Sequence, residues 1–286
     1  MNSSIGSDDK NSPRQGSRTD STIFEGFHVE THTFAGQDRL AYWSPVTGPG
    51  VIVCHEMPGI TPEVIAFARR LVAAGFTVVM PHLIGDPGRP MTLGYTVRSM
   101  SKLCISNEFS LLAKHASSPA TEWLRELGRV LHHRAGGPGI GAIGMCFSGN
   151  FALSLLLDAH LLAPVLSQPS MPIALTAAHA RALHAPPAAI EAAKSRACPV
   201  LALRFTNDRL VPAARFETLR RELGDLAELI EIDSSKGNPH GIKRTAHSVL
   251  TFDLVDEVGH PTRAALDRVM RFLDERLRPA SDAPAA

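Results

Sequence analysis

Short, wholly apolar segments alternate with amphipathic segments along most of the chain, and this alternation constrains the fold more than any other feature. The first such run, Val51 to Cys54, follows a Gly-Pro-Gly turn. Runs of this length are typical of strands buried on both faces of a parallel sheet. Thr61 and Pro62 then mark a helix N-terminus, and apolar residues recur at helical spacing until Gly75. The pattern predicts a strand, a helix and a return to the next strand.

The same alternation continues to the C-terminal end. Further strands are expected at 76–80, 140–143, 200–205 and 226–232, and further helices at 120–134, from Ser148, at 213–223 and around 266–277. Two alternating runs, at 27–34 and 39–43, precede them and predict an antiparallel hairpin. We therefore expect an α/β fold with a mostly parallel central sheet and helices on both faces. The segments 85–119 and 161–197 stay unassigned and are expected to be lids or to carry helices of their own.

Composition narrows the class of partner. The 286 residues carry a formal net charge of +1 without a long run of Lys or Arg, so neither a nucleic acid nor a membrane surface is an expected partner. We expect one globular domain over 23–278, with disordered tails at 1–22 and 279–286. No secretory signal and no membrane-spanning stretch is recognised, which makes the cytoplasm the expected location. The four cysteines lack a C-x-x-C pairing, which argues against a zinc knuckle and a thioredoxin-type motif, so free thiols are expected.

The segment from Gly141 to Asn150 carries the strongest chemical signal. An apolar strand ends there at Cys146, with the small residues Gly144 and Ser148 two positions on either side. A nucleophile in a sharp turn between strand and helix needs such small neighbours, and the helix N-terminus favours a thiolate and an oxyanion. Ser148 fits the nucleophile's place less well, because its own neighbours two positions away are Cys146 and Asn150. A buried structural cysteine is the alternative interpretation.

A thiol nucleophile needs a base, and the base needs an orienting carboxylate. In this class of fold, the order along the chain is nucleophile, acid, histidine. Asp208 follows a buried strand and precedes a helix start, where the acid is expected, although a turn with a helix cap uses the same residue types. His240, His247 and His260 follow the last strand, and spacing alone does not separate them. We favour His247 over His240, and expect His260 to be solvated or to cap the terminal helix.

Together these motifs resemble those of dienelactone hydrolases, a family of the α/β-hydrolase superfamily. The resemblance covers roughly residues 26–277 and rests on V-I-V-C-H-E-M-P-G, G-M-C-F-S-G, N-D-R-L-V-P and the His247-Ser248 step. It implies an α/β-hydrolase fold and a catalytic triad of Cys146, Asp208 and His247.

The resemblance also implies roles outside the triad. Glu56 is expected to assist activation of the thiol, although an acidic loop residue without a function is the simpler interpretation. The backbone N–H groups of Met57 and Phe147 are expected to bind the oxyanion. Arg98 and His240 are candidate substrate contacts on the basis of this sequence alone and not of the resemblance.

The chain departs from the family pattern at two positions. Ser148 stands in place of the second elbow glycine, which can narrow the turn or add a hydroxyl near the thiol. Thr251 stands four residues after His247, where the family has an arginine that holds the substrate carboxylate. Other arginines are candidates to replace it in space: Arg98, Arg204, Arg209 and Arg244.

The resemblance implies a cysteine-dependent hydrolase that cleaves a small-molecule ester or lactone through a thioester intermediate. This hydrolysis requires no metal or organic cofactor, and none is expected. A carboxylesterase or thioesterase for uncharged acyl substrates is an alternative, because the family arginine is missing. A non-catalytic binding protein on the same scaffold is another, since a fold does not fix a function. Redox sensing through Cys146 and Cys54 is a third alternative. It is disfavoured because no cysteine lies near Cys146 in the sequence.

Overall fold

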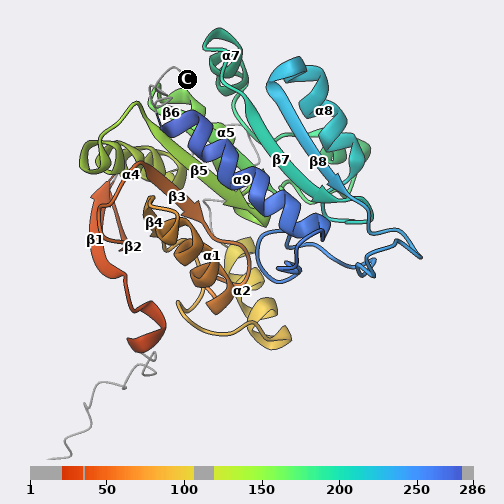
Figure 1. The fold of residues 1–286 in the computed structure, drawn as a ribbon, viewed down its shortest axis with the longest axis horizontal. Helices are drawn as coiled ribbons and strands as arrows, with labels where there is room; N and C mark the ends of the chain where they lie inside the picture. The colour runs from red at the N-terminus through yellow and green to blue at the C-terminus, as the bar shows by residue number, and fades with distance from the viewer. Residues whose placement is uncertain (1–20, 35, 106–118, 279–286) are drawn as a thin grey trace, which may run out of the picture.

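A single mixed sheet forms the centre of the molecule. The computed structural model describes residues 21–34, 36–105 and 119–278. The strands are β1 (His28–Phe34), β2 (Gln37–Trp43), β3 (Gly50–Cys54), β4 (Thr77–Pro81), β5 (Ile140–Met145), β6 (Leu161–Ser167), β7 (Val200–Phe205) and β8 (Ala227–Ile232). They lie in the order β1-β2-β4-β3-β5-β6-β7-β8 (Figure 1). β1 and β2 form the expected antiparallel hairpin, β2 is antiparallel to β4, and all neighbours from β4 to β8 are parallel.

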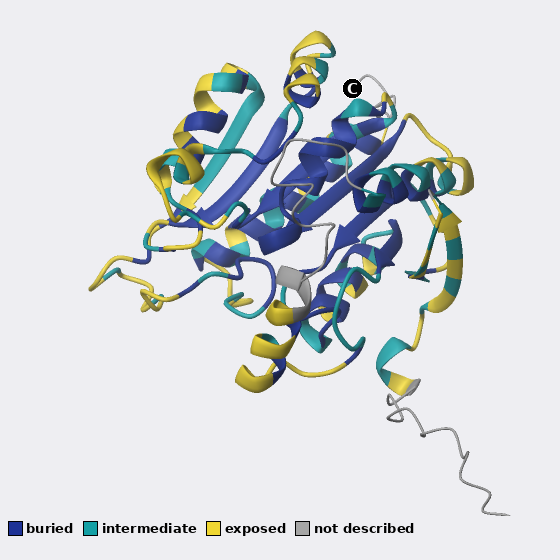
Figure 2. Cartoon of the chain, turned by 180° about the vertical axis from the view of Figure 1, so that it is seen from behind, coloured by how far each residue is buried: buried dark blue, intermediate teal, exposed yellow. Residues whose placement is uncertain are grey.

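Helices cover both faces of this sheet. They are α1 (Pro62–Ala73), α2 (Leu93–Ile105), α4 (Pro119–Ala135), α5 (Phe151–Ser154), α6 (Ala177–Arg181), α7 (Pro187–Ser195), α8 (Ala213–Leu223) and α9 (Pro261–Leu277). The apolar sides of α1 and α9 pack on one face, and those of α4, α5, α7 and α8 on the other. Every residue of β3, β4, β5 and β7 is buried between these layers (Figure 2). The predicted architecture, a mostly parallel sheet with helices on both faces, is confirmed.

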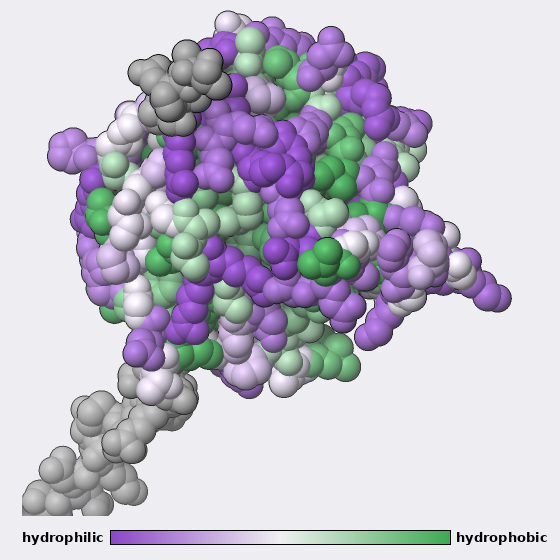
Figure 3. Space-filling model, viewed as in Figure 1, coloured by the Kyte–Doolittle hydropathy of each residue, from purple (hydrophilic) through white to green (hydrophobic). Residues whose placement is uncertain are grey.

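The surface in front of α1 and α9 is mainly hydrophilic, and its hydrophobic residues lie in small separate groups (Figure 3). Within the described residues, no helix is both long enough and apolar enough to cross a bilayer. The tails expected at 1–22 and 279–286 lie outside the described residues, apart from residues 21–22, which belong to the 3-10 turn η1 (Ser21–Phe24).

The segment 161–197, unassigned from its pattern, contains the central strand β6 as well as α6 and α7. Pro164 stands in the middle of β6, and a proline normally argues against a central strand because it lacks the N–H that a ladder requires. Pro164 lies opposite Ala142 of β5, and pairing of β6 with β7 begins only at Val165, so no residue of β7 is paired with the position that lacks an N–H. The other unassigned segment, 85–119, contains α2, and its residues 106–118 lie outside the described part of the chain.

The helix expected from Ser148 is short and broken. The segment contains the 3-10 turn η2 (Cys146–Ser148), the four-residue helix α5, and the 3-10 turn η3 (Leu155–Leu157). A macrodipole needs a run of aligned peptide units, so a broken segment of this kind supplies less of it than a long helix. The segment after Cys146 therefore supplies less of a helix dipole at this turn than a continuous helix would supply.

Candidate active site

Cys146 occupies a strained turn at the carboxyl end of β5. Its φ is +54°, a left-handed conformation that costs a non-glycine residue on the order of 1–3 kcal/mol. Close packing enforces the turn, because a Cβ on Gly144 would lie 2.3 Å from the Ser148 carbonyl oxygen, and one on Gly149 would lie 2.6 Å from the Cα of Pro169. Both positions therefore require glycine. This is the geometry of the nucleophile elbow expected from the sequence.

The Ser148 hydroxyl fixes this turn to the neighbouring strand. It is fully buried and accepts a hydrogen bond from the Met145 N–H at 3.0 Å. It also lies 2.9 Å from each of the carbonyl oxygens of Cys54, His55 and Met145, and its single proton serves one of them at a time. The serine that replaces the family glycine thus joins the elbow to the carboxyl end of β3.

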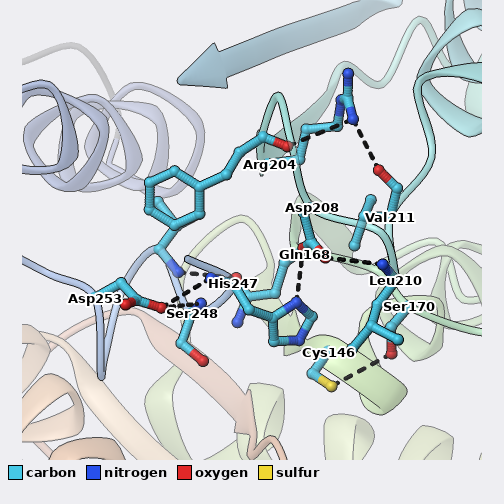
Figure 4. Close-up of polar contacts among 12 residues, drawn as sticks. Cys146, Gln168, Ser170, Arg204, Asp208, Leu210, Val211, His247, Ser248 and Asp253 are labelled. Atoms are coloured by element: carbon cyan, nitrogen blue, oxygen red, sulfur yellow. Dashed lines mark hydrogen bonds and ion pairs between the residues drawn. The ribbon is translucent and has the colours of Figure 1, made fainter. Parts of the chain in front are cut away.

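Asp208 and His247 form a direct pair beyond the ends of β7 and β8. The Nδ1 of His247 lies 2.6 Å from the Oδ2 of Asp208, whose other oxygen accepts from the Leu210 N–H at 2.9 Å. The loop of His247 is held by Asp253, whose carboxylate accepts from the N–H groups of His247 and Ser248 at 2.8 and 2.9 Å. Figure 4 shows the imidazole between the Asp208 carboxylate and Cys146. The structure therefore brings together the three residues predicted as the triad.

Charge at the site favours a protonated His247. Burial by itself lowers the pKa of this histidine, but its charge interaction with the Cys146 side chain and its hydrogen bond to Asp208 outweigh burial and raise its pKa well above the ordinary value. Its Nε2 is buried and has no hydrogen-bond partner within the described residues. This nitrogen is free to exchange a proton with the sulfur or with a bound substrate.

Glu56 lies at the end of β3, with 1% of its surface exposed. Its carboxylate accepts hydrogen bonds from Ser248 Oγ at 2.5 Å, from Gln168 Nε2 at 3.2 Å, and from Thr251 Oγ1. Burial raises its pKa. Among the described residues it makes no hydrogen bond to the Cys146 sulfur, and its contacts to Ser248 and Thr251 join it to the loop of His247. Thr251, at the position of the family arginine, is one of its donors.

His55, inside one of the motifs but without a predicted role, fixes the loop that carries Met57. The ring is completely buried, with Nδ1 2.8 Å from the Glu56 carbonyl oxygen and Nε2 3.1 Å from the Leu83 nitrogen. These contacts fit a neutral ring that donates from Nδ1 and accepts at Nε2. Burial lowers the pKa of His55 to about 3.

This pKa predicts acid sensitivity. An unfolded histidine binds a proton below about pH 6.5, whereas folded His55 does so only below about 3. Between these values the unfolded state holds more protons, so the free energy of unfolding should fall by up to about 1.4 kcal/mol per pH unit as the pH decreases. Urea unfolding at pH 4 to 7 should give a shallower dependence for His55→Gln than for the wild type. His28→Gln, at an exposed histidine, is the control, and equal slopes for His55→Gln and the wild type would contradict this assignment.

An open cavity of about 700 Å³ lies beside His247 and Asp208. Two of its lining arginines, Arg209 and Arg244, are exposed. The third, Arg204, is buried and paired with the Glu231 carboxylate at 2.7 Å. Of the candidate replacements for the family arginine, Arg209 and Arg244 are therefore the two with free access to a ligand in this cavity.

The two candidate substrate contacts lie elsewhere. Arg98 is exposed on α2 and is not among the residues that line this cavity. His240 is also exposed, and its ring centroid lies 5.5 Å from that of His260. The structure does not bring either residue to the triad. His260 accepts a hydrogen bond from the Thr262 N–H and caps α9. Capping was one of the two roles expected for this histidine.

Sequence reasoning missed two polar residues that follow β6. The Oγ of Ser170 lies 3.3 Å from the Cys146 sulfur, and Gln168 donates to Glu56. No sequence motif marks either position, because both contacts join segments that are far apart in the chain.

Among the described residues, no cluster of His, Cys, Asp and Glu side chains has the arrangement of a metal site.

Known proteins resemble this chain in sequence and in fold. A model of the dienelactone hydrolase family matches residues 39–277. The chain is 28% identical over 146 residues to a Saccharomyces cerevisiae protein described as "Putative carboxymethylenebutenolidase", a match that covers 49% of this chain and 52% of the yeast protein. The chain thus spans about half the length of that curated relative.

Two solved structures share the fold. A protein from Klebsiella pneumoniae, described as "Putative Dienelactone Hydrolase", superimposes with a TM-score of 0.58 and 17% identity, over 87% of this chain and 99% of that chain. The dienelactone hydrolase from Anabaena variabilis gives a TM-score of 0.54 and 16% identity, over 88% of this chain and 98% of that chain.

The chain thus has the α/β-hydrolase fold. Because the family model covers most of its length, the assignment is more specific: the chain belongs to the dienelactone hydrolase family.

Proposed function

We propose that this chain is a cysteine-dependent hydrolase that cleaves a small-molecule ester or lactone with Cys146, His247 and Asp208. One observation carries the proposal: a 2.6 Å contact between His247 and Asp208 orients the imidazole beside a cysteine held in a left-handed turn. A buried structural cysteine needs neither the strained backbone nor the oriented histidine. The arrangement instead meets the requirement for a nucleophile, a base and an orienting group in contact.

In acylation, the Cys146 thiolate attacks the carbonyl carbon and forms a C–S bond, and the carbonyl π electrons move to the oxygen. We propose that the backbone N–H groups of Met57 and Phe147 bind this oxyanion. When the oxyanion collapses, the C–O bond to the alcohol breaks, and the leaving alkoxide takes the proton from His247 Nε2. The product is a thioester on Cys146. For a lactone, the alcohol stays attached to the acyl chain.

In deacylation, the now neutral His247 takes a proton from water, and the resulting hydroxide attacks the thioester. Collapse of this second oxyanion breaks the C–S bond, releases the acid and restores the thiolate beside the imidazolium. Glu56 contributes as a positioning residue, because its contacts to Ser248 and Thr251 hold the loop of His247.

The cavity beside His247 and Asp208, whose lining does not include Cys146, bears on the class of substrate. Arg209 and Arg244 line it and are exposed, which favours a substrate with an anionic group. Thr251 in place of the family arginine favours the second candidate function, hydrolysis of uncharged acyl esters or thioesters, because its hydroxyl binds Glu56 and offers no charge to a ligand.

Substrate comparison tests the proposal. Turnover should be measured for dienelactone, which carries a carboxylate, and for a neutral aryl ester. If the two arginines bind the anion, Arg209→Ala and Arg244→Ala should each raise KM for dienelactone by about tenfold and change neutral ester hydrolysis by less than about twofold. Equal effects on both substrates would favour the uncharged class. Ligand binding without turnover of any ester would favour a non-catalytic binding protein.

A further inference from the structure

Ser170 contacts Cys146 through both its side chain and its backbone. Its Oγ lies 3.3 Å from the Cys146 sulfur, and its N–H donates to the Cys146 carbonyl oxygen at 3.0 Å. Both residues are buried, with 6% and 8% of their surfaces exposed. Figure 4 shows the hydroxyl next to the sulfur. The hydroxyl therefore lies in the immediate environment of the reacting atom.

Arg215 of α8 holds the segment that carries Ser170. The Arg215 side chain is completely buried. Its guanidinium donates to the carbonyl oxygens of Pro169 at 2.7 Å and Pro172 at 2.6 Å, on either side of Ser170. Two further carbonyl oxygens, of His179 and Ala182, accept from it at 3.0 Å. Burial lowers the pKa of this arginine to about 10, so it stays charged at neutral pH. The hydroxyl is thus held in place before any substrate binds.

The chemistry of the pair defines the direction of the hydrogen bond. A serine hydroxyl has one proton to donate, and a thiolate can only accept. Whenever Cys146 is ionised, the bond therefore runs from Ser170 to the sulfur and gains strength from the charge. A thioester sulfur carries no charge and accepts only weakly, so the bond favours the free thiolate over its protonated and acylated forms.

We propose that the Ser170 hydroxyl donates a hydrogen bond to the Cys146 thiolate and is a further catalytic residue of this site. It increases the fraction of Cys146 that is ionised before acylation, and it stabilises the thiolate as the leaving group in deacylation. This rests on the proposed function only in that Cys146 is the nucleophile. Since the helix after the elbow is short and broken, this donor supplies part of the stabilisation that a long helix would give.

The test is the pH profile of Cys146 alkylation by iodoacetamide in the full chain, followed by peptide mass spectrometry. Ser170→Ala should move the midpoint of the profile upward by roughly one pH unit and slow alkylation below the midpoint by about tenfold. Ser170→Thr, which keeps the hydroxyl, should restore the rate to within about twofold. Ser154→Ala removes the hydroxyl of another buried serine, on α5, and should leave the profile unchanged.

An unchanged profile for Ser170→Ala would overturn the proposal, and so would equal losses in the Ala and Thr variants when thermal unfolding shows that both are folded. Alkylation requires no ester, so this result is separate from the proposed function. If Cys146→Ala retained esterase activity, the proposed function would fail, while the shift in the alkylation profile would still measure the Ser170 contact.

Discussion

Cys146→Ala is expected to lower kcat/KM for a small aryl ester by about 10⁴-fold or more. The side chain supplies the electron pair that attacks the carbonyl, and a methyl group cannot replace it. The fold should persist, because the strained turn is held by Gly144, Ser148 and Gly149 rather than by the sulfur. Steady-state hydrolysis of p-nitrophenyl acetate, with circular dichroism to check the fold, measures the effect.

The matched control is Cys198→Ala. Cys198 is another buried free thiol, but it lies after α7 and touches backbone carbonyl groups rather than the triad. Its replacement should leave kcat/KM within about twofold. Near-normal esterase activity in Cys146→Ala would place the nucleophile elsewhere and remove the basis of the mechanism.

Asp208→Asn is expected to lower kcat by about 10³- to 10⁴-fold with little effect on the fold. The Asp208 carboxylate accepts from His247 Nδ1, so a neutral imidazole leaves its lone pair on Nε2, facing the sulfur. An asparagine amide that donates to Nδ1 reverses this tautomer and puts the proton on Nε2. The same substitution removes a negative charge that raises the pKa of His247.

Asp253→Asn is the control for this prediction. Asp253 accepts hydrogen bonds from the backbone of the same loop but none from the imidazole, so its loss disturbs the position of the loop without changing the tautomer. We expect a loss of kcat within about tenfold. A comparable loss in both variants would show that Asp208 acts only by holding the loop.

Most of the fold could be predicted because each buried strand is a short apolar run and each helix has one apolar side. The hairpin, β3, α1, β7 and α8 all lie close to their predicted bounds. β6 could not be predicted in this way, because Pro164 interrupts the sequence pattern of a central strand. Only the pairing of β6 with its neighbour β7 shows that the strand tolerates a residue without a backbone N–H at this position. The break after the elbow was equally hidden, since Phe151 to Leu157 has the composition of an uninterrupted helix.

The triad was predictable because chain order and strand ends restrict where its members can stand. Side-chain contacts between segments far apart in the chain could not be predicted from the sequence. Glu56 is 192 residues from Ser248 and 195 from Thr251, and these contacts exist only once the carboxyl ends of the strands lie together. The same holds for Ser170, whose hydroxyl reaches the sulfur from the loop after the neighbouring strand β6.

Formation of a thioester on Cys146 is the central claim, and trapping it is the most direct test. Wild-type enzyme mixed with excess p-nitrophenyl acetate and quenched in acid within milliseconds should carry one acetyl group by intact mass. Peptide mapping should place it on Cys146, and hydroxylamine should remove it. Turnover without any acyl group on Cys146, or with the group on a serine, would contradict the account.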